Sequence, residues 1–77
     1  MKEKLRTFIQ DELVSEKVAI QYDDNLLLAG IIDSLGFIKM IQWIEKEYKV
    51  TIPARDILIE NFMSLNAVEN YLKTQIN

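Results

Sequence analysis

The chain has 77 residues, enough for one domain with a modest core, so a large internal active site is not expected. Apolar residues make up 49% of the chain and charged residues 27%, a balance that indicates a folded protein rather than a disordered segment. The formal net charge of -3 argues against a nucleic-acid-binding protein, which would present clustered Lys and Arg to phosphates.

Two residue types that carry much of enzyme chemistry, Cys and His, are absent from the chain. Their absence excludes disulfides, thiolate metal sites, and the Ser-His or Cys-His pairs that activate a nucleophile. We therefore expect the protein not to be an enzyme. Any reactive chemistry would come from a prosthetic group or a partner enzyme.

Neither a membrane span nor a secretory signal is expected. The longest mainly apolar stretch covers residues 26–32, far fewer than the roughly 20 residues needed to cross a bilayer. Charged residues are scattered through the first part of the chain, where a signal peptide would have an uninterrupted apolar segment. These features predict a cytoplasmic protein.

Helical spacing of apolar residues predicts a first helix from Lys2 to about Val14, with Leu5, Phe8, Ile9 and Leu13 on its inner face. Residues 15–32 show neither the helical nor the strand period and contain turn-prone residues 23–25. They predict a long ordered loop. Its apolar side chains would pin it across the helices: Val18, Ile20, Leu26, Leu27, Ile31 and Ile32.

A second helix is predicted from Ser34 to Tyr48. At about 100° per residue, one side of it carries a core stripe and the other side an outward face, with Trp43 on the flank between them. The core stripe consists of Phe37, Met40, Ile41, Ile44 and Tyr48. The outward face, called the helix-two face below, consists of Leu35, Ile38, Lys39, Gln42 and Lys46.

The β-branched stretch 49–53 ends in proline and predicts a short extended connection. A brief third helix is expected from Ala54 to about Glu60, with Ile57 and either Leu58 or Ile59 turned inward. Ser64 is a good N-cap for a last helix from Leu65 to about Ile76. Its expected inward residues are Leu65, Val68, Leu72 and Ile76, with Tyr71 beside them. The prediction is one all-α domain, residues 1–77, built as a bundle of three main helices and one short helix.

Asp33 and Ser34 stand at the start of the second helix, where unpaired backbone N–H groups and the helix dipole favour an anion. Most Ser and Asp residues at such positions only cap the helix, and Asp33 suits that role. A hydrolase using Ser34 is disfavoured because no histidine could serve as its base. The residues alone leave a simple cap and an attachment site both open.

Several ordered features together resemble the acyl carrier and peptidyl carrier protein family, in its discrete stand-alone form. They are Asp33-Ser34-Leu35 at the head of the second helix, the stripe from Met40 to Tyr48, Val50-x-Ile52-Pro53, and Glu60-Asn61-Phe62 before the last helix. The resemblance implies a four-helix carrier fold. It also implies that Ser34 carries a covalent 4'-phosphopantetheine arm bearing acyl or aminoacyl thioesters. A phosphopantetheinyl transferase would load the arm, with Asp33 as a recognition residue.

The resemblance further implies that the helix-two face docks onto partner enzymes. From Ser34 to Tyr48 two basic and two acidic residues balance, whereas carriers of fatty acid synthesis are rich in Glu and Asp on this helix. We therefore predict a monomeric carrier for a specialised acyl or amino-acid-activating pathway, served by an activating ligase and downstream acyl-processing enzymes. Alternatives are a general fatty acid synthesis carrier and a small helical interaction domain without a prosthetic group.

Phe37 and Met40 lie below Ser34 on the inner side of the second helix. They could line a cavity that shelters an acyl chain, or simply fill the core. A bulky Phe near the mouth of such a cavity would restrict long chains, which favours short acyl or aminoacyl cargo.

Overall fold

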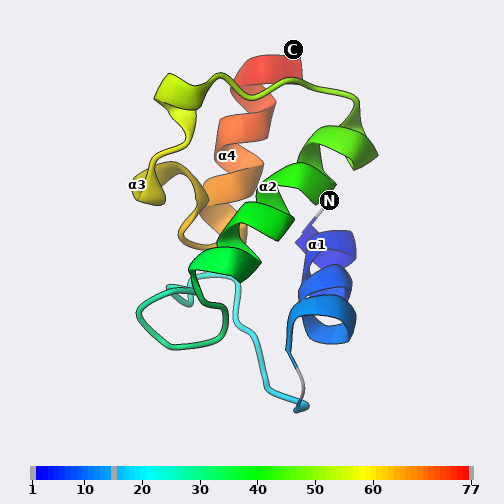
Figure 1. Ribbon diagram of the computed structural model, residues 1–77, viewed down its shortest axis with the longest axis vertical. Coiled ribbons are helices and arrows are strands. Elements are labelled where there is room, and N and C mark those ends of the chain that lie inside the picture. Colours follow the sequence, from blue (N-terminus) through cyan, green and yellow to red (C-terminus); the bar gives the residue numbers. More distant parts are fainter. Residues whose placement is uncertain (1, 15, 77) are drawn as a thin grey trace.

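The computed structural model describes residues 2–14 and 16–76, apart from the side chain of Ile76. In the described part of the chain every regular element is helical, as predicted (Figure 1). The order is α1 (Lys2–Phe8), the π-helical segment η1 (Ile9–Leu13), α2 (Ser34–Tyr48), the 3-10 turn η2 (Ala54–Asp56), α3 (Ile59–Phe62) and α4 (Leu65–Ile76).

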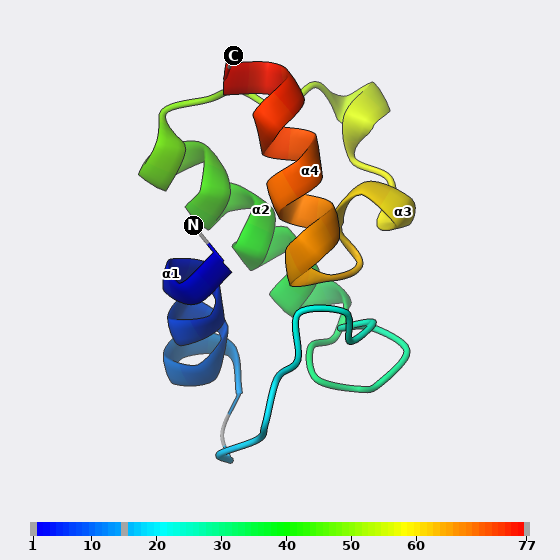
Figure 2. The same cartoon turned by 180° about the vertical axis from the view of Figure 1, so that it is seen from behind.

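The helices α1, α2 and α4 form the bundle, and α3 lies beside α4 (Figures 1 and 2). The long loop runs beneath the start of α2, at the opposite end of the molecule from the connection between α2 and η2 (Figure 1). Residues from α1, the loop, α2 and α4 share one core. Its buried side chains are Leu5, Ile9, Ile20, Leu26, Ile32, Met40, Ile41, Ile44, Ile52, Phe62, Leu65, Val68 and Leu72.

The first helix follows its prediction closely, with Leu5 and Ile9 buried and Phe8 and Leu13 packed against the core. Its last turn differs in type, because residues Ile9–Leu13 form a wider π-helix rather than a continued α-helix. Val14 is extended, with φ of -121° and ψ of 128°, and so ends the helix one residue before the predicted boundary.

The long loop is held by backbone hydrogen bonds centred on Leu26. Its N–H donates to the carbonyl of Met63 at 2.7 Å, and its own carbonyl accepts from the N–H groups of Ile31 and Ile32 at 3.0 and 3.1 Å. Since buried backbone groups must be paired, these bonds explain how a long irregular segment is ordered in a small protein. They join the loop to the turn that precedes α4.

Side chains anchor the loop as predicted, with one exception. Ile20, Leu26 and Ile32 are buried, and Leu27 and Ile31 pack against the core. Val18 is 38% exposed, so the prediction that it pins the loop is wrong. The backbone nearby is held instead by Gln10, whose Oε1 accepts from the Val18 N–H at 3.4 Å.

The predicted third helix over Ala54 to Glu60 is wrong. The chain forms η2, becomes extended at Leu58 (φ -112°, ψ 144°), and only then forms α3. A continued helix would need the Asp56 carbonyl for the N–H of residue 60. That carbonyl instead accepts from the Leu58 N–H at 2.8 Å and from Nδ2 of Asn61 at 2.9 Å. The segment Glu60-Asn61-Phe62 therefore lies within α3 and not after the short helix.

The inward orientation predicted for this segment is also wrong. Ile57, Leu58 and Ile59 are 39%, 45% and 59% exposed. Phe62 makes the core contact of α3, fully buried with its ring 5.0 Å from that of Tyr71. Of the exposed residues, Ile57 lies beside α2, where it lines a pocket with Phe37 and Ile38.

The final helix is capped as predicted. Ser64 is 7% exposed, and its Oγ accepts a hydrogen bond from the Ala67 N–H at 3.1 Å. Leu65, Val68 and Leu72 are buried as expected. The predicted inward position of the Ile76 side chain lies outside the described residues. No helix in the described ranges is long and apolar enough to cross a membrane.

Candidate functional site

Asp33 shapes the start of α2. Its backbone is extended, with φ of -100° and ψ of -173°, and its Oδ1 accepts a hydrogen bond from the Gly36 N–H at 2.7 Å. The Asp33 carbonyl accepts the first bond of the helix, from the Phe37 N–H at 2.9 Å. Asp33 is therefore the N-cap, as the sequence predicted.

Ser34 is the first residue of α2 and is exposed to solvent. Because the Asp33 side chain makes the capping bond, the Ser34 hydroxyl is not needed to hold the helix start. A phosphate ester formed on this oxygen would lie at the positive end of a helix of 15 residues. At an exposed position that interaction contributes about 0.3–1 kcal/mol.

The backbone around Ser34 is fixed from below by Ile32 and Gly36. Ile32 is 4% exposed. A Cβ added to Gly36 would lie 3.2 Å from the Ile32 Cβ and 3.3 Å from Oδ1 of Asp33, so a side chain there would push these neighbours aside by a few tenths of an ångström. Gly30 turns the loop toward this contact with a φ of 73°, which favours glycine. The hydroxyl thus projects from a rigid base.

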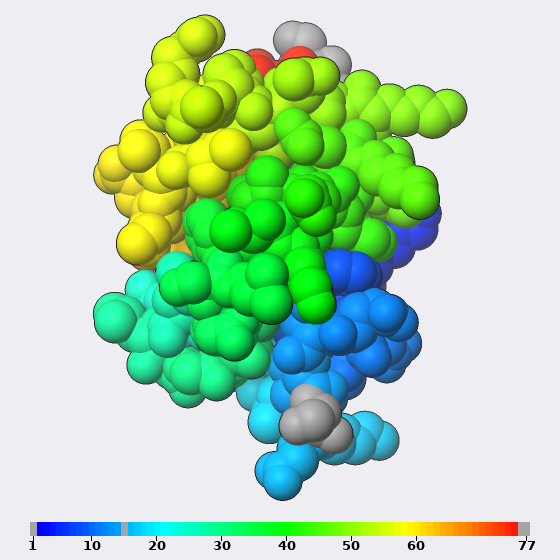
Figure 3. Space-filling model, in the orientation of Figure 1, coloured from blue at the N-terminus to red at the C-terminus, as the bar shows by residue number. Residues whose placement is uncertain are grey.

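The predicted helix-two face is exposed along its whole length. Leu35 and Ile38 are 59% and 53% exposed, and Lys39, Gln42 and Lys46 are exposed with them. In the space-filling view, α2 runs across the middle of the visible surface (Figure 3). A mainly apolar pocket opens beside this face, lined by Phe37, Ile38, Ile41, Gln42, Glu45 and Ile57.

One residue of this pocket was not predicted from the sequence. Ile57 was expected in the core, but it faces α2 across this pocket. Pro53 gave no signal of this change, because a proline restricts the residue before it and is tolerated at the start of a helix.

Phe37 and Met40 were expected either to line a cavity or to fill the core, and the structure gives a different answer for each residue. Met40 is fully buried and fills the core. Phe37 is half-buried, packs edge-on against Phe62 with ring centroids 6.3 Å apart, and lines the pocket.

The two acidic residues of α2 make contacts within the fold, whereas its two basic residues are exposed on the helix-two face. Oε2 of Glu45 accepts a hydrogen bond from the Ile52 N–H at 2.8 Å. Glu47 pairs with Lys4 of α1 at 2.9 Å. Both carboxylates are thus engaged within the fold, whereas Lys39 and Lys46 are exposed on the helix-two face. Among the described residues no cluster of His, Cys, Asp or Glu could hold a metal ion.

A protein family described as "Phosphopantetheine attachment site" matches residues 3–72, nearly the whole described chain. The chain belongs to this family of carrier proteins. It is a carrier and not an enzyme, and it holds acyl or aminoacyl intermediates as thioesters on a covalent 4'-phosphopantetheine arm. The family also implies interaction with phosphopantetheinyl transferases and ligases. The alternative of an interaction domain without a prosthetic group is excluded.

Individual relatives are similar over most of their length. The D-alanyl carrier protein of Streptococcus suis (strain 98HAH33) is 32% identical over 68 residues, which cover 88% of this chain and 85% of that protein. The D-alanyl carrier protein of Streptococcus mutans serotype c (strain ATCC 700610 / UA159) is 30% identical over 60 residues, covering 78% of this chain and 76% of that protein.

The site fits the prosthetic group that the family carries. A phosphodiester needs an accessible hydroxyl and surroundings that tolerate negative charge. The exposed Ser34 at the N-terminus of α2 offers both, and the neighbouring Asp33 carboxylate is already bound to a backbone N–H. When attached, the arm supplies a terminal thiol that the cysteine-free chain lacks.

Proposed function

We propose that Ser34 is the attachment residue and that the arm carries a small aminoacyl group, D-alanyl in the first instance. One observation at the start of α2 supports Ser34 as the attachment residue: Asp33 caps the helix and the serine hydroxyl is exposed. Support for the cargo comes from the relatives, which are D-alanyl carrier proteins.

Asp33 has a second role in this proposal. Its carboxylate lies directly before the attachment residue and is exposed. We assign it to recognition by the phosphopantetheinyl transferase in addition to its capping bond. The two roles can be separated, because capping needs any short oxygen acceptor whereas recognition needs the charge.

The helix-two face is proposed as the docking surface for the ligase and later enzymes. Leu35 and Ile38 give it an apolar centre, and the exposed cations Lys39 and Lys46 lie around them. A partner with a strongly basic docking patch would gain little long-range attraction from this face. This supports an amino-acid-activating pathway over bulk fatty acid synthesis.

Phe37 supports a small cargo. Its half-buried ring, three residues after Ser34, lines the apolar pocket beside the helix-two face and packs against Phe62. A long acyl chain entering there would have to displace an aromatic contact within the core, whereas an alanyl group would not. We expect long chains to remain outside the protein.

Attachment is tested by incubating the apo-protein with coenzyme A and a broad-specificity phosphopantetheinyl transferase. Intact-mass and peptide mapping should show one phosphopantetheine on Ser34 and none on Ser34→Ala. The matched control is Ser64→Ala, which changes the other serine at a helix start and should still be modified. Modification of another residue, or of Ser34→Ala, would refute the assignment.

Cargo is tested on the loaded carrier with two sets of enzymes. A D-alanine-activating ligase with ATP and D-alanine should acylate the arm faster than the acyl transferases of fatty acid synthesis acylate it with acyl donors. The reverse order would favour the general fatty acid synthesis carrier. Sedimentation of the loaded carrier should show the monomer that we propose, and cell fractionation should place it in the cytoplasm.

A further inference from the structure

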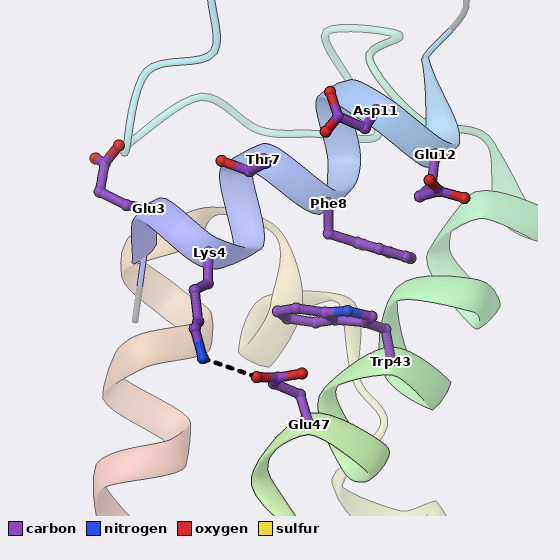
Figure 4. Close-up of a pocket in the computed structure, with 8 residues that line it drawn as sticks. All are labelled: Glu3, Lys4, Thr7, Phe8, Asp11, Glu12, Trp43 and Glu47. Atoms are coloured by element: carbon purple, nitrogen blue, oxygen red, sulfur yellow. Dashed lines mark hydrogen bonds and ion pairs between the residues drawn. The ribbon is translucent and has the colours of Figure 1, made fainter.

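A second surface lies on the side of the bundle where α1 meets the later half of α2. It is a groove lined by residues of α1, η1 and α2, among them Phe8, Asp11, Glu12 and Trp43 (Figure 4). Trp43 is half a turn around α2 from Ser34 and about 13 Å along the helix axis, at 100° and 1.5 Å per residue. The groove is therefore separate from the attachment site.

The floor of the groove is aromatic. Phe8 of α1 and Trp43 of α2 stack with ring centroids 4.9 Å apart and an interplanar angle of 16°. Tyr48 supports Trp43 from the edge, with centroids 5.9 Å apart. Phe8 and Trp43 are only half-buried, so part of this aromatic surface faces the groove. This aromatic platform between two helices presents ring edges to the groove, because each ring covers one face of the other (Figure 4).

The rim of the groove carries four carboxylates and one amine. Two carboxylates are engaged, because Glu47 pairs with Lys4 at 2.9 Å and Glu3 lies 3.3 Å from Arg6. The other two, Asp11 and Glu12, are exposed and join no ion pair within the described ranges. The net charge around the aromatic platform is therefore negative.

We infer that this groove docks a basic segment of a partner protein, one in which Arg or Lys stands next to an apolar side chain. The cations would pair with Asp11 and Glu12. Their aliphatic stems and the apolar side chain would lie on the exposed edges of the Phe8–Trp43 stack. Charge complementarity selects this occupant over an acidic or neutral segment.

The inference goes beyond carriage of a cargo. A partner held in this groove would leave Ser34 and the helix-two face open, so one protein could hold the carrier while another acts on its arm. A single shared docking surface would not allow this.

Trp43 is the sole tryptophan of the chain, so its fluorescence and its indole N–H signal report directly on the groove. The probe is the peptide acetyl-Arg-Leu-Arg-Lys-amide, titrated into the arm-bearing full chain and, separately, into Ser34→Ala. Both chains should show shifts of the indole signal and of the backbone amides near Asp11, with affinity that falls as salt rises. Agreement between the two chains makes the result independent of the attachment site.

The variant Asp11→Lys/Glu12→Lys should weaken peptide binding by about tenfold, because two exposed ion pairs are replaced by repulsions. The matched control Glu16→Lys/Glu60→Lys changes the net charge equally at exposed acids outside the groove and should lose far less affinity. A second control, Leu35→Ser/Ile38→Ser, alters the helix-two face and should bind the peptide as the parent chain does.

Several results would overturn the inference: no binding, shifts on another face, equal binding of acetyl-Glu-Leu-Glu-Glu-amide, or equal losses in the groove variant and its charge control. Saturation by arginine amide alone at the same concentration would assign the groove to a small organic cation instead of a peptide. Indole shifts that follow carrier concentration without peptide would assign it to a second copy of the chain.

Discussion

The carboxylate of Asp33 accepts a 2.7 Å hydrogen bond from the backbone N–H of Gly36, so the acid closes the first turn of α2 and the neighbouring serine does not. This bond separates two tasks that adjacent residues at a helix start could otherwise share. The aspartate holds the helix, and the serine is accessible to another protein.

Replacing Asp33 tests the two roles proposed for it. Asp33→Ala should lower the free energy of unfolding by about 1 kcal/mol, because the cap is lost, and should slow loading by the transferase. Asp33→Ser keeps a capping oxygen and should restore most of the stability. If the carboxylate is recognised, loading of Asp33→Ser stays slow; full recovery of the loading rate would leave Asp33 with the capping role alone. Urea unfolding and the initial rate of loading measure the two effects.

The two serines at helix starts should behave in opposite ways. Ser34→Ala removes an exposed hydroxyl that makes no capping bond, so stability should change by less than about 0.5 kcal/mol while loading is abolished. Ser64→Ala removes a buried cap bonded to the Ala67 N–H, so stability should fall by about 1 kcal/mol while loading continues. Thermal unfolding and intact-mass analysis of both variants check this crossed pattern.

Gly30 should not tolerate a side chain in spite of the open space around it. No atom lies within 4 Å of a Cβ added there, but the φ of 73° places the residue in the left-handed region. Gly30→Ala should therefore cost about 1 kcal/mol of unfolding free energy, and Gly30→Asn less, since Asn adopts this region more readily. An Ala variant as stable as the parent would show that the turn can rearrange.

Tyr71 should make stability depend on pH in alkaline solution. Burial, together with the 2.8 Å hydrogen bond to Asp56, raises the pKa of Tyr71 to about 12. Its neutral form is favoured in the folded state, so the stabilisation is complete below the unfolded pKa near 10 and is lost as pH rises from about 10 to 12. Urea titrations at several pH values should show a shallower decline for Tyr71→Phe. Identical slopes would mean that folding does not raise the pKa of Tyr71.

The corrected path of residues 57–62 predicts a sharp contrast in stability. Leu58→Ser and Ile59→Ser alter exposed side chains and should change unfolding free energy by less than about 0.5 kcal/mol. Phe62→Ala empties a fully buried site and should cost about 3–5 kcal/mol. A large loss of unfolding free energy for Leu58→Ser, measured by chemical denaturation, would show that this side chain is buried in the core.

The parts of the fold that the sequence predicted well are those determined by local chemistry. Asp33 and Ser64 cap their helices, and the spacing of Met40, Ile41 and Ile44 places them on the buried side of α2. Caps and a helical period act over a few residues, so they can be read without knowing what lies opposite.

The failures lie where distant or competing contacts decide. The residues 54–60 contain good helix formers, but Asn61 bonds to the Asp56 carbonyl and ends the helix before it can continue. The groove between α1 and α2 could not be predicted either, because the stack of Phe8 on Trp43 joins residues 35 positions apart. The helical period placed Trp43 on the flank of α2 but gave no partner for it.

The hydrogen bond from Leu26 to the Met63 carbonyl has a consequence for the order of events during synthesis. The loop that supports Ser34 is completed by Met63, which follows Ser34 by 29 positions, and the Tyr22 carbonyl accepts a further bond from the Asn66 N–H at 3.1 Å. A nascent chain with Ser34 already outside the ribosome would still lack these partners. We therefore expect arm attachment to require that the chain has been synthesised through the start of α4, so that shorter nascent chains escape modification.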